Sequence, residues 1–138
     1  MEYTDRELLD KAKEAMVYSY SPYSRFKVGA CVLTKDGHIY TGCNIENSSF
    51  GATNCAERTA FFKAVSEGVQ DFEAICIVGG RNQKPTGYTA PCGVCRQVMM
   101  EFCNPKTFKI ILAIDRENYR VYTLEDMLPQ GFGPANLE

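Results

Sequence analysis

The stretch FKVGACVLTKDGHIYTGC, residues 26–43, decides the first half of the fold because it reads as two strands joined by a tight turn. Every second side chain of its first half points to one side of a strand: Phe26, Val28, Ala30 and Val32. The residues between them point to the other side: Lys27, Gly29, Cys31 and Leu33. Residues 35–38 (Lys-Asp-Gly-His) carry the Asp-Gly turn signal, and residues 39–43 return as the second strand of a hairpin. We therefore expect a β-hairpin over this stretch.

A helix precedes the hairpin. Residues 4–7 (Thr-Asp-Arg-Glu) have the order of a capping box, in which Thr4 covers the first free amides and Glu7 reaches back. Apolar residues follow at helical spacing: Leu8, Leu9, Ala12, Ala15 and Met16. Ser21-Pro22 ends this pattern.

Two more helices follow the hairpin after loops. Residues 44–54 form a polar, glycine-containing loop, and residues 55–67 have helical composition with Gly68 as their stop. The expected buried stripe of this helix is apolar: Ala60, Phe61, Ala64 and Val65. Residues 93–102 predict the second helix, in which apolar residues recur four apart: Val94, Val98 and Phe102.

Three more strands and a short last helix complete the pattern. Residues 74–79 are a short apolar run, and residues 109–115 are apolar on both faces, which is typical of a central strand. Residues 119–123 predict an edge strand, and a helix that begins at Thr123 ends before Pro129. This order predicts a three-layer α/β fold, with a mixed five-stranded sheet flanked by helices, in one domain spanning residues 1–138.

Composition excludes several classes of protein. The chain has 138 residues, 45% hydrophobic and 23% charged, which is the balance of a globular domain rather than of a disordered tail or a coiled coil. The net charge of −2 lacks the basic excess of nucleic-acid-binding proteins, so we expect a small-molecule substrate. No segment approaches the ~18 apolar residues of a membrane span. A charged start and an odd number of cysteines, seven, predict a reducing cytoplasm.

The chemistry-bearing residues lie in two segments, TNCAER (residues 53–58) and PCGVCRQ (residues 91–97). Cys92 and Cys95 have the Cys-x-x-Cys spacing with which two thiolates bind one zinc ion. Cys55 stands at the start of the other helix, where free amides and the helix dipole favour a thiolate. If the two helices lie side by side, all three sulfur atoms can bind the same ion.

A structural zinc site or a redox pair is the simpler interpretation of Cys-x-x-Cys, but a structural site needs a fourth ligand. Cys103 lies ~12 Å along a continuous helix from Cys95, and His38, the one histidine, belongs to the hairpin turn. The other cysteines fall in strands as small core residues: Cys31, Cys43 and Cys76. Three ligands with an open position are typical of a catalytic zinc ion that holds a water molecule.

Glu57 supplies the group that such a water molecule needs. It follows Cys55 by two residues, in the first turn of the helix, so its carboxylate can reach a group bound at the helix end. A carboxylate beside a metal-bound water can take its proton and pass it on. Alone, Glu57 would equally complement the helix dipole, but together with the three cysteines it predicts a catalytic role.

Cys55-Ala56-Glu57 followed by Pro91-Cys92-Gly93-Val94-Cys95 resembles the signature of the zinc-dependent cytidine deaminase family. Three further segments resemble the same family: SPYSRFKVGA (21–30), NIEN (44–47) and LPQGFGP (128–134). The resemblance covers nearly the whole chain and matches the small homotetrameric nucleoside enzymes. It implies a cytidine-deaminase-like fold, one Zn²⁺ per subunit, and hydrolysis of cytidine and 2′-deoxycytidine to uridine, 2′-deoxyuridine and ammonia in pyrimidine salvage.

The same resemblance implies a role for each residue of the metal site. The implied zinc ligands are three thiolates: Cys55, Cys92 and Cys95. Glu57 is the implied proton shuttle, and Arg58 the residue that hydrogen-bonds the ligand sulfurs, with Gln97 as a second candidate for that role. A nearby cation has a clear purpose, because three thiolates on Zn²⁺ leave the site with a charge of −1 and reduce its electrophilicity.

The resemblance also implies substrate contacts. Phe26 is expected against the pyrimidine ring, Asn44 and Glu46 at the ribose hydroxyls, and Ala56 beside the base. Residues on a neighbouring subunit are expected to close the pocket: Ser48, Phe50 and Phe132. The alternative for Phe132 is a tail folded back on its own domain. The segment of residues 81–90 is longer than the resemblance leads us to expect.

Three rival functions remain open at this stage. An aminonucleoside antibiotic deaminase of the blasticidin S type has related zinc motifs, although Phe26, Asn44 and Glu46 favour a plain nucleoside. A non-enzymatic zinc module would need the missing fourth ligand. A redox protein that uses Cys92 and Cys95 would leave Cys55 unexplained.

Overall fold

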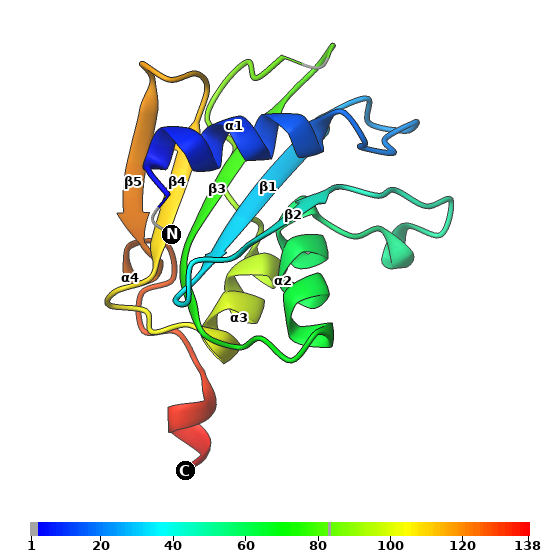
Figure 1. Ribbon diagram of the computed structural model, residues 1–138. Helices are drawn as coiled ribbons and strands as arrows, with labels where there is room; N and C mark the ends of the chain where they lie inside the picture. Colours follow the sequence, from blue (N-terminus) through cyan, green and yellow to red (C-terminus); the bar gives the residue numbers. More distant parts are fainter. Residues whose placement is uncertain (1–2, 83) are drawn as a thin grey trace.

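Five strands form one mixed sheet, in the order β2-β1-β3-β4-β5, in the computed structural model of the protein (Figure 1). The structure describes residues 3–82 and 84–138. The strands are β1 (Lys27–Thr34), β2 (Ile39–Cys43), β3 (Phe72–Gly80), β4 (Lys109–Ala113) and β5 (Tyr119–Thr123). Strand β1 pairs antiparallel with β2 and β3, β3 pairs parallel with β4, and β4 pairs antiparallel with β5. The predicted mixed five-stranded sheet is confirmed.

Helices cover both faces of this sheet. They are α1 (Asp5–Met16), α2 (Ala56–Ser66), α3 (Gly93–Phe102) and α4 (Leu124–Met127), with 3₁₀ turns η1 (Phe50–Ala52) and η2 (Pro134–Leu137). Helix α1 lies across one face, and α2 and α3 lie on the other (Figure 1). The capping box of Thr4 and Glu7 is present at the start of α1. None of the helices in residues 3–82 and 84–138 is long and apolar enough to span a bilayer.

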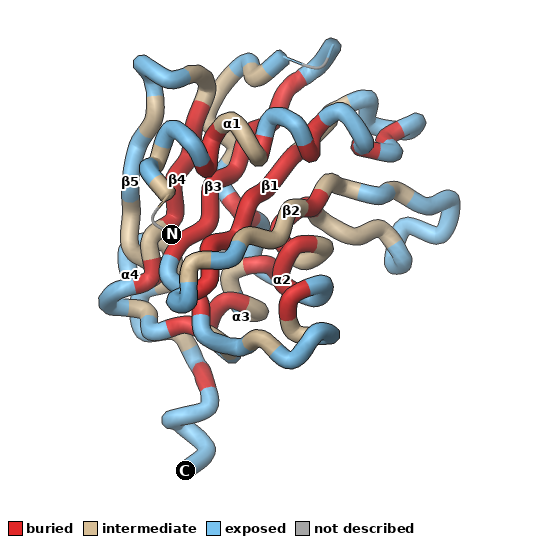
Figure 2. The backbone as a smooth tube through the Cα atoms, viewed as in Figure 1, coloured by how far each residue is buried: buried red, intermediate tan, exposed pale blue. Residues whose placement is uncertain are grey.

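The alternation of β1 divides the core into two layers. Ala30 and Val32 belong to the layer beneath α2 and α3, together with the fully buried ring of Phe61. Cys31 and Leu33 belong to the layer beneath α1. The central strands are consequently buried along most of their length, whereas β5 at the sheet edge is largely exposed (Figure 2). The expected alternation is confirmed, and both faces of the sheet are covered.

Helix α2 packs directly on the backbone of β2. A Cβ atom at Gly42 would stand 2.5 Å from the Ala56 carbonyl oxygen and 2.6 Å from the Ala60 nitrogen. Only glycine allows the first turn of α2 to come so close to the strand. Gly42 therefore determines how far above the sheet α2 begins. The positions of Cys55 and Glu57, which lie at that helix start, depend on this distance.

Strand boundaries differ from the predicted ones by a single residue at the start of β1 and the end of β3, and by two residues at the start of β3 and the end of β4. Strand β3 begins at Phe72 rather than at residue 74, because its first residues extend the pairing with β1. Strand β4 ends at Ala113 rather than at residue 115, because the Asp115 carboxylate accepts the backbone N–H groups of Glu117 and Asn118 and closes a turn. Side-chain hydrogen bonds of this kind compete with strand pairing.

The buried face of α3 carries Cys95 and Met99, so the Cys95 sulfur faces α2. Of the three apolar residues that recur four apart, Val98 and Phe102 pack against the core, whereas Val94 is 56% exposed.

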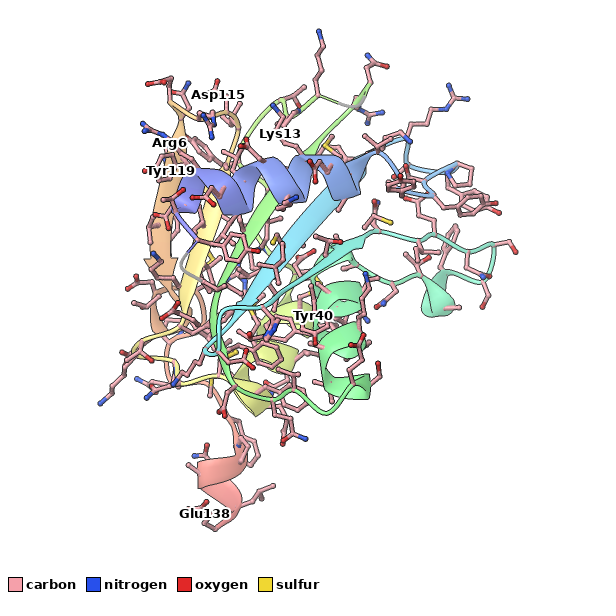
Figure 3. All side chains as sticks on the ribbon, viewed as in Figure 1. Arg6, Lys13, Tyr40, Asp115, Tyr119 and Glu138 are labelled. Atoms are coloured by element: carbon pink, nitrogen blue, oxygen red, sulfur yellow. The ribbon has the colours of Figure 1, made fainter. Side chains whose placement is uncertain are left out.

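The C-terminal segment leaves the body of the molecule. The turn η2 projects away from the sheet and its helices (Figure 1). Glu138 lies at its far end (Figure 3). The segment begins beside α3, where the Gln97 side chain donates to the Phe132 carbonyl at 2.8 Å.

Candidate functional site

The starts of α2 and α3 bring three sulfur atoms together. Cys55 is the N-cap of α2 and Cys92 the N-cap of α3, and Cys95 lies in the first turn of α3. The Cys55 Sγ lies 3.7 Å from the Cys92 Sγ, which lies 3.5 Å from the Cys95 Sγ. All three atoms lie within 4.8 Å of one another. The predicted convergence of the two helix starts is present in the structure.

This geometry fits a zinc ion. Tetrahedral coordination with Zn–S bonds of ~2.3 Å separates the sulfur atoms by about 3.8 Å, close to the distances found here. The residues considered as a fourth ligand lie elsewhere: His38 Nδ1 is 3.1 Å from the Asp36 carboxylate at the hairpin turn, and Cys103 is buried at the C-cap of α3. Within the described ranges, the cluster offers three ligands and an open position.

The environment of the Cys55 sulfur favours the thiolate form. The pKa of Cys55 is lowered most by a hydrogen bond from the Cys95 thiol, and to a smaller extent by one from Arg58. The Arg58 Nη2 donates to the Cys55 Sγ at 3.3 Å. The structure therefore has the sulfur contact that the sequence predicts for Arg58. The buried Nε of the same guanidinium finds no hydrogen-bond partner among the described residues.

Glu57 is the buried acid of the site. Its side chain occupies the first turn of α2, two residues after Cys55, and is only 4% exposed. Burial raises the pKa of Glu57 to about 7. A carboxyl group with a pKa near neutrality can both accept and release a proton during turnover.

Asn44 is held by hydrogen bonds on both ends of its amide. Its Oδ1 accepts the Val28 N–H at 2.9 Å and the Ser19 hydroxyl. Its Nδ2 donates to the Phe26 carbonyl at 2.8 Å. Two of the predicted substrate residues, Asn44 and Phe26, are thus joined directly at the start of β1.

Glu46 is held in a separate way. One carboxylate oxygen, Oε1, accepts the N–H groups of Tyr23 at 2.9 Å and Ser24 at 3.1 Å, and Oε2 accepts the Ser24 hydroxyl. These bonds lower the pKa of Glu46 below its ordinary value despite some desolvation. Glu46 therefore presents an ionised acceptor. A cleft surrounds it: Tyr23, Ser24, Glu46, Asn47, Phe50 and Thr53.

The segment of residues 81–90 folds back beside Phe26. Gly87 bridges Gly79 of β3, and a Cβ atom at Gly79 would collide with the Thr89 hydroxyl and the Phe26 ring. Tyr88 receives the Arg120 guanidinium at 4.2 Å from its ring centroid, which ties the segment to β5. Thr89 of this segment thus lies close to the ring expected to contact the base.

The other predicted residues divide into an inner and an outer group. Ala56 is fully buried beside Glu57. Phe50 and Phe132 are 78% and 57% exposed, and Ser48 is exposed as well. Cys92, also exposed, leaves one side of the sulfur cluster uncovered. Gln97 contacts the Phe132 carbonyl, so its predicted role at the sulfur atoms stays a prediction.

Sequence reasoning missed the residues that hold the predicted ones in place. They are Ser19, Tyr23, Ser24, Gly42 and Thr89. Serines in a loop and a single glycine in a strand carry no pattern of their own. The one available signal is the density of polar residues around Pro22, near Ser19 and Ser24, where a turn between a helix and a strand needs internal hydrogen bonds.

Comparison with known proteins agrees with this geometry. A family model described as the cytidine and deoxycytidylate deaminase zinc-binding region matches residues 2–111. A protein of Sporosarcina psychrophila named cytidine deaminase is 46% identical over 131 residues, which are 95% of this chain and 93% of that protein. The cytidine deaminase of Halalkalibacterium halodurans is 48% identical over 129 residues, 93% of this chain and 94% of that protein.

A solved structure also resembles this chain, both in sequence and in fold. The crystal structure of cytidine deaminase from Burkholderia pseudomallei superimposes with a TM-score of 0.85 at 45% identity, and covers 94% of this chain and 100% of that one. The sulfur cluster with its adjacent buried carboxyl, the match over most of the sequence and the shared fold lead to one conclusion. The chain belongs to the cytidine and deoxycytidylate deaminase family.

Proposed function

We propose that this protein is an enzyme that hydrolyses cytidine and 2′-deoxycytidine to uridine and 2′-deoxyuridine, with release of ammonia. The observation that carries this proposal is the buried Glu57 carboxyl beside three converging cysteines with an open position. Bound by these thiolates, Zn²⁺ would lower the pKa of a water molecule and so supply the nucleophile at neutral pH.

Glu57 moves the protons of the reaction. It accepts a proton from the attacking water and delivers it to N3 of the pyrimidine, which makes C4 more electrophilic. Attack of the resulting hydroxide at C4 gives a tetrahedral carbon that bears a hydroxyl and the amine. Glu57 then carries the proton of this C4 hydroxyl to the amine, so that the C4–N bond breaks, ammonia leaves and the C4 carbonyl of the product forms. Its pKa, raised to about 7 by burial, suits a residue that must take and give protons alternately.

Asn44 and Glu46 form a complementary pair for the sugar hydroxyls. Both lone pairs of the Asn44 oxygen are engaged, which leaves an N–H of its amide as the group available to substrate. Glu46 offers a carboxylate acceptor. A hydroxyl group needs one donor and one acceptor, and this pair supplies both. Phe26 supports the ring of the base, and Ala56 contacts it beside Glu57.

The protein is proposed to act as a homotetramer in the cytoplasm, with pockets shared between subunits. Phe50 and Phe132 are exposed aromatic rings, and the turn η2 that follows Phe132 projects away from the body of its own chain, which supports contact with a neighbour. Such a contact would cover the open side of the sulfur cluster and exclude water from the reaction. Seven free cysteines support a reducing compartment.

Loss of ultraviolet absorbance during incubation with cytidine tests the proposed reaction. We expect turnover with the metal-loaded enzyme, loss of turnover after chelation, and recovery with added Zn²⁺. A panel that includes free cytosine and an aminonucleoside antibiotic measures substrate class. Metal-loaded protein that binds zinc stoichiometrically and leaves all of these compounds unchanged would establish a structural zinc module instead.

A further inference from the structure

Ser19 lies beside the proposed sugar site although it belongs to the turn that follows α1. The backbone of this turn is joined to the Asn44 segment: the Tyr20 N–H donates to the Asn44 carbonyl at 3.0 Å, and the Glu46 N–H donates to the Tyr20 carbonyl at 2.8 Å. The Lys27 Nζ donates to the Ser19 carbonyl at 3.3 Å. Ser19 itself is only 8% exposed. Its position relative to Asn44 is therefore fixed by the backbone.

The hydroxyl groups of this turn form a directed chain. The Ser19 Oγ lies within hydrogen-bond distance of both the Asn44 Oδ1 and the Ser21 Oγ, the latter at 3.2 Å. A hydroxyl has one proton, and a carbonyl oxygen can only accept. The Ser19 proton therefore goes to Asn44, and the Ser21 hydroxyl, also 8% exposed, donates to the Ser19 oxygen.

This chain acts with the Val28 N–H and the Phe26 carbonyl to hold the Asn44 amide in one orientation. The Ser19 hydroxyl and the Val28 N–H occupy both lone pairs of Oδ1. The Nδ2 group gives one hydrogen to the Phe26 carbonyl and keeps the other. In the opposite amide orientation, the NH₂ group would face the Val28 N–H, so that orientation is unfavourable.

We propose that Ser19 is a positioning residue for the sugar site: its hydroxyl, supported by Ser21, holds the Asn44 amide with an N–H directed at a hydroxyl oxygen of the nucleoside. Glu46 is held by Tyr23 and Ser24 and not by this chain, so Ser19 acts on the donor half of the pair alone. The inference rests on the proposed function, because it requires that Asn44 binds the sugar.

The test compares Ser19→Ala with the parent enzyme on two substrates, cytidine and 2′,3′-dideoxycytidine, which lacks both secondary hydroxyls. Loss of one neutral hydrogen bond is expected to change binding by about three- to tenfold. We expect KM for cytidine to rise by this factor with little change in kcat, and KM for the dideoxy compound to stay unchanged. Ser19→Thr, which keeps the hydroxyl, should restore the parent KM.

Further variants distinguish the positioning role of Ser19 from the sugar-binding role of Asn44 on which it rests. Asn44→Ala should raise KM for cytidine more than Ser19→Ala does, and Ser19→Ala should add nothing in the double variant. Ser21→Ala, which leaves the Ser19–Asn44 bond in place, should have the smaller effect of the two serine variants. The temperature of unfolding of each variant shows whether folding is affected.

Two kinds of result overturn the inference while the proposed function stands. In one, Asn44→Ala discriminates between the substrates and Ser19→Ala does not. In the other, Ser19→Ala raises KM equally for both substrates or is matched by Ser21→Ala, which reveals a merely structural role. If Asn44→Ala itself fails to discriminate while cytidine is deaminated, the sugar site is misplaced and both proposals for Asn44 fail.

Discussion

Gly42→Ala is the sharpest perturbation that the fold offers, because it moves the metal site without altering any residue of it. A Cβ at this position would stand 2.5 Å from the Ala56 carbonyl oxygen, whereas ordinary contact begins at 3.4 Å. The start of α2 must therefore rise by about 0.9 Å. Both colliding groups, the Ala56 carbonyl and the Ala60 N–H, belong to the helix backbone, so no side chain can rotate away.

The expected consequences are large. Overpacking against rigid atoms costs about 3 kcal/mol of unfolding free energy, the upper end of its usual range. Metal sites tolerate distance errors of only ~0.2 Å, so the displacement of Cys55 relative to α3 should weaken zinc binding. A misplacement of ~1 Å at a catalytic group can reduce the rate by ~10²-fold, and we expect a loss of kcat of that order.

Three measurements follow: the urea midpoint of unfolding, the zinc content after dialysis against a weak chelator, and kcat for cytidine. Gly87→Ala is the neutral control, because a Cβ there meets nothing within 4 Å. Gly29→Ala is the control for steric overlap itself, since its Cβ would collide with the backbone of α1 at Ala12, on the other face of the sheet. The Gly29→Ala variant should have a lower urea midpoint of unfolding, while the molecules that remain folded keep their zinc. Parent-like zinc content and kcat in Gly42→Ala would refute the argument that Gly42 positions the site.

The other predictions concern residues of the site itself. Glu57→Gln should keep the fold and the metal but lose turnover by ~10²–10⁴-fold or more; more than a tenth of the parent activity would remove Glu57 from its role. Cys55→Ala should lose zinc affinity and thermal stability together, because the ligands join two helix starts, and an unchanged zinc affinity would show that Cys55 is not a ligand. Free cytosine should have a far lower kcat/KM than cytidine, since Asn44 and Glu46 use the sugar to place C4; equal values would contradict their assignment. Mixed tetramers of Phe132→Ala and Glu57→Ala subunits should be more active than the sum of the parents, and the absence of any gain after demonstrated subunit exchange would mean that Phe132 acts within its own chain.

Local signals in the sequence were sufficient for most of the fold. The capping box at Thr4 and the Asp36-Gly37 turn act through neighbouring residues, so their outcome does not depend on distant parts of the chain. The helix at residues 93–102 and the strand at residues 119–123 have the predicted bounds for the same reason. Local facts place the cysteines at two helix starts, and their convergence is predicted on the condition that the two helices lie side by side, which the structure meets.

What the sequence could not reveal depends on contacts between distant segments. The end of β4 is decided by a side-chain turn at Asp115, and the exposure of Val94 by the orientation of α3, which faces Cys95 toward α2. The short turns η1 and η2 have no periodicity long enough to predict. Ser19 is 25 residues from Asn44 in the chain, and nothing in a lone loop serine indicates such a partner.

The two chain ends differ in what can be attached to them. The first helix begins on the face of the sheet opposite the cysteines, so an affinity tag before α1 extends away from the chemistry (Figure 1). The last residues form the projecting turn η2, which follows Phe132 and has Glu138 at its tip (Figure 3). In the proposed tetramer a fusion partner there would lie between subunits, and we expect it to disturb assembly and substrate binding together. Surface immobilisation of the enzyme through its N-terminal end should therefore preserve activity, whereas attachment through its C-terminal end should not.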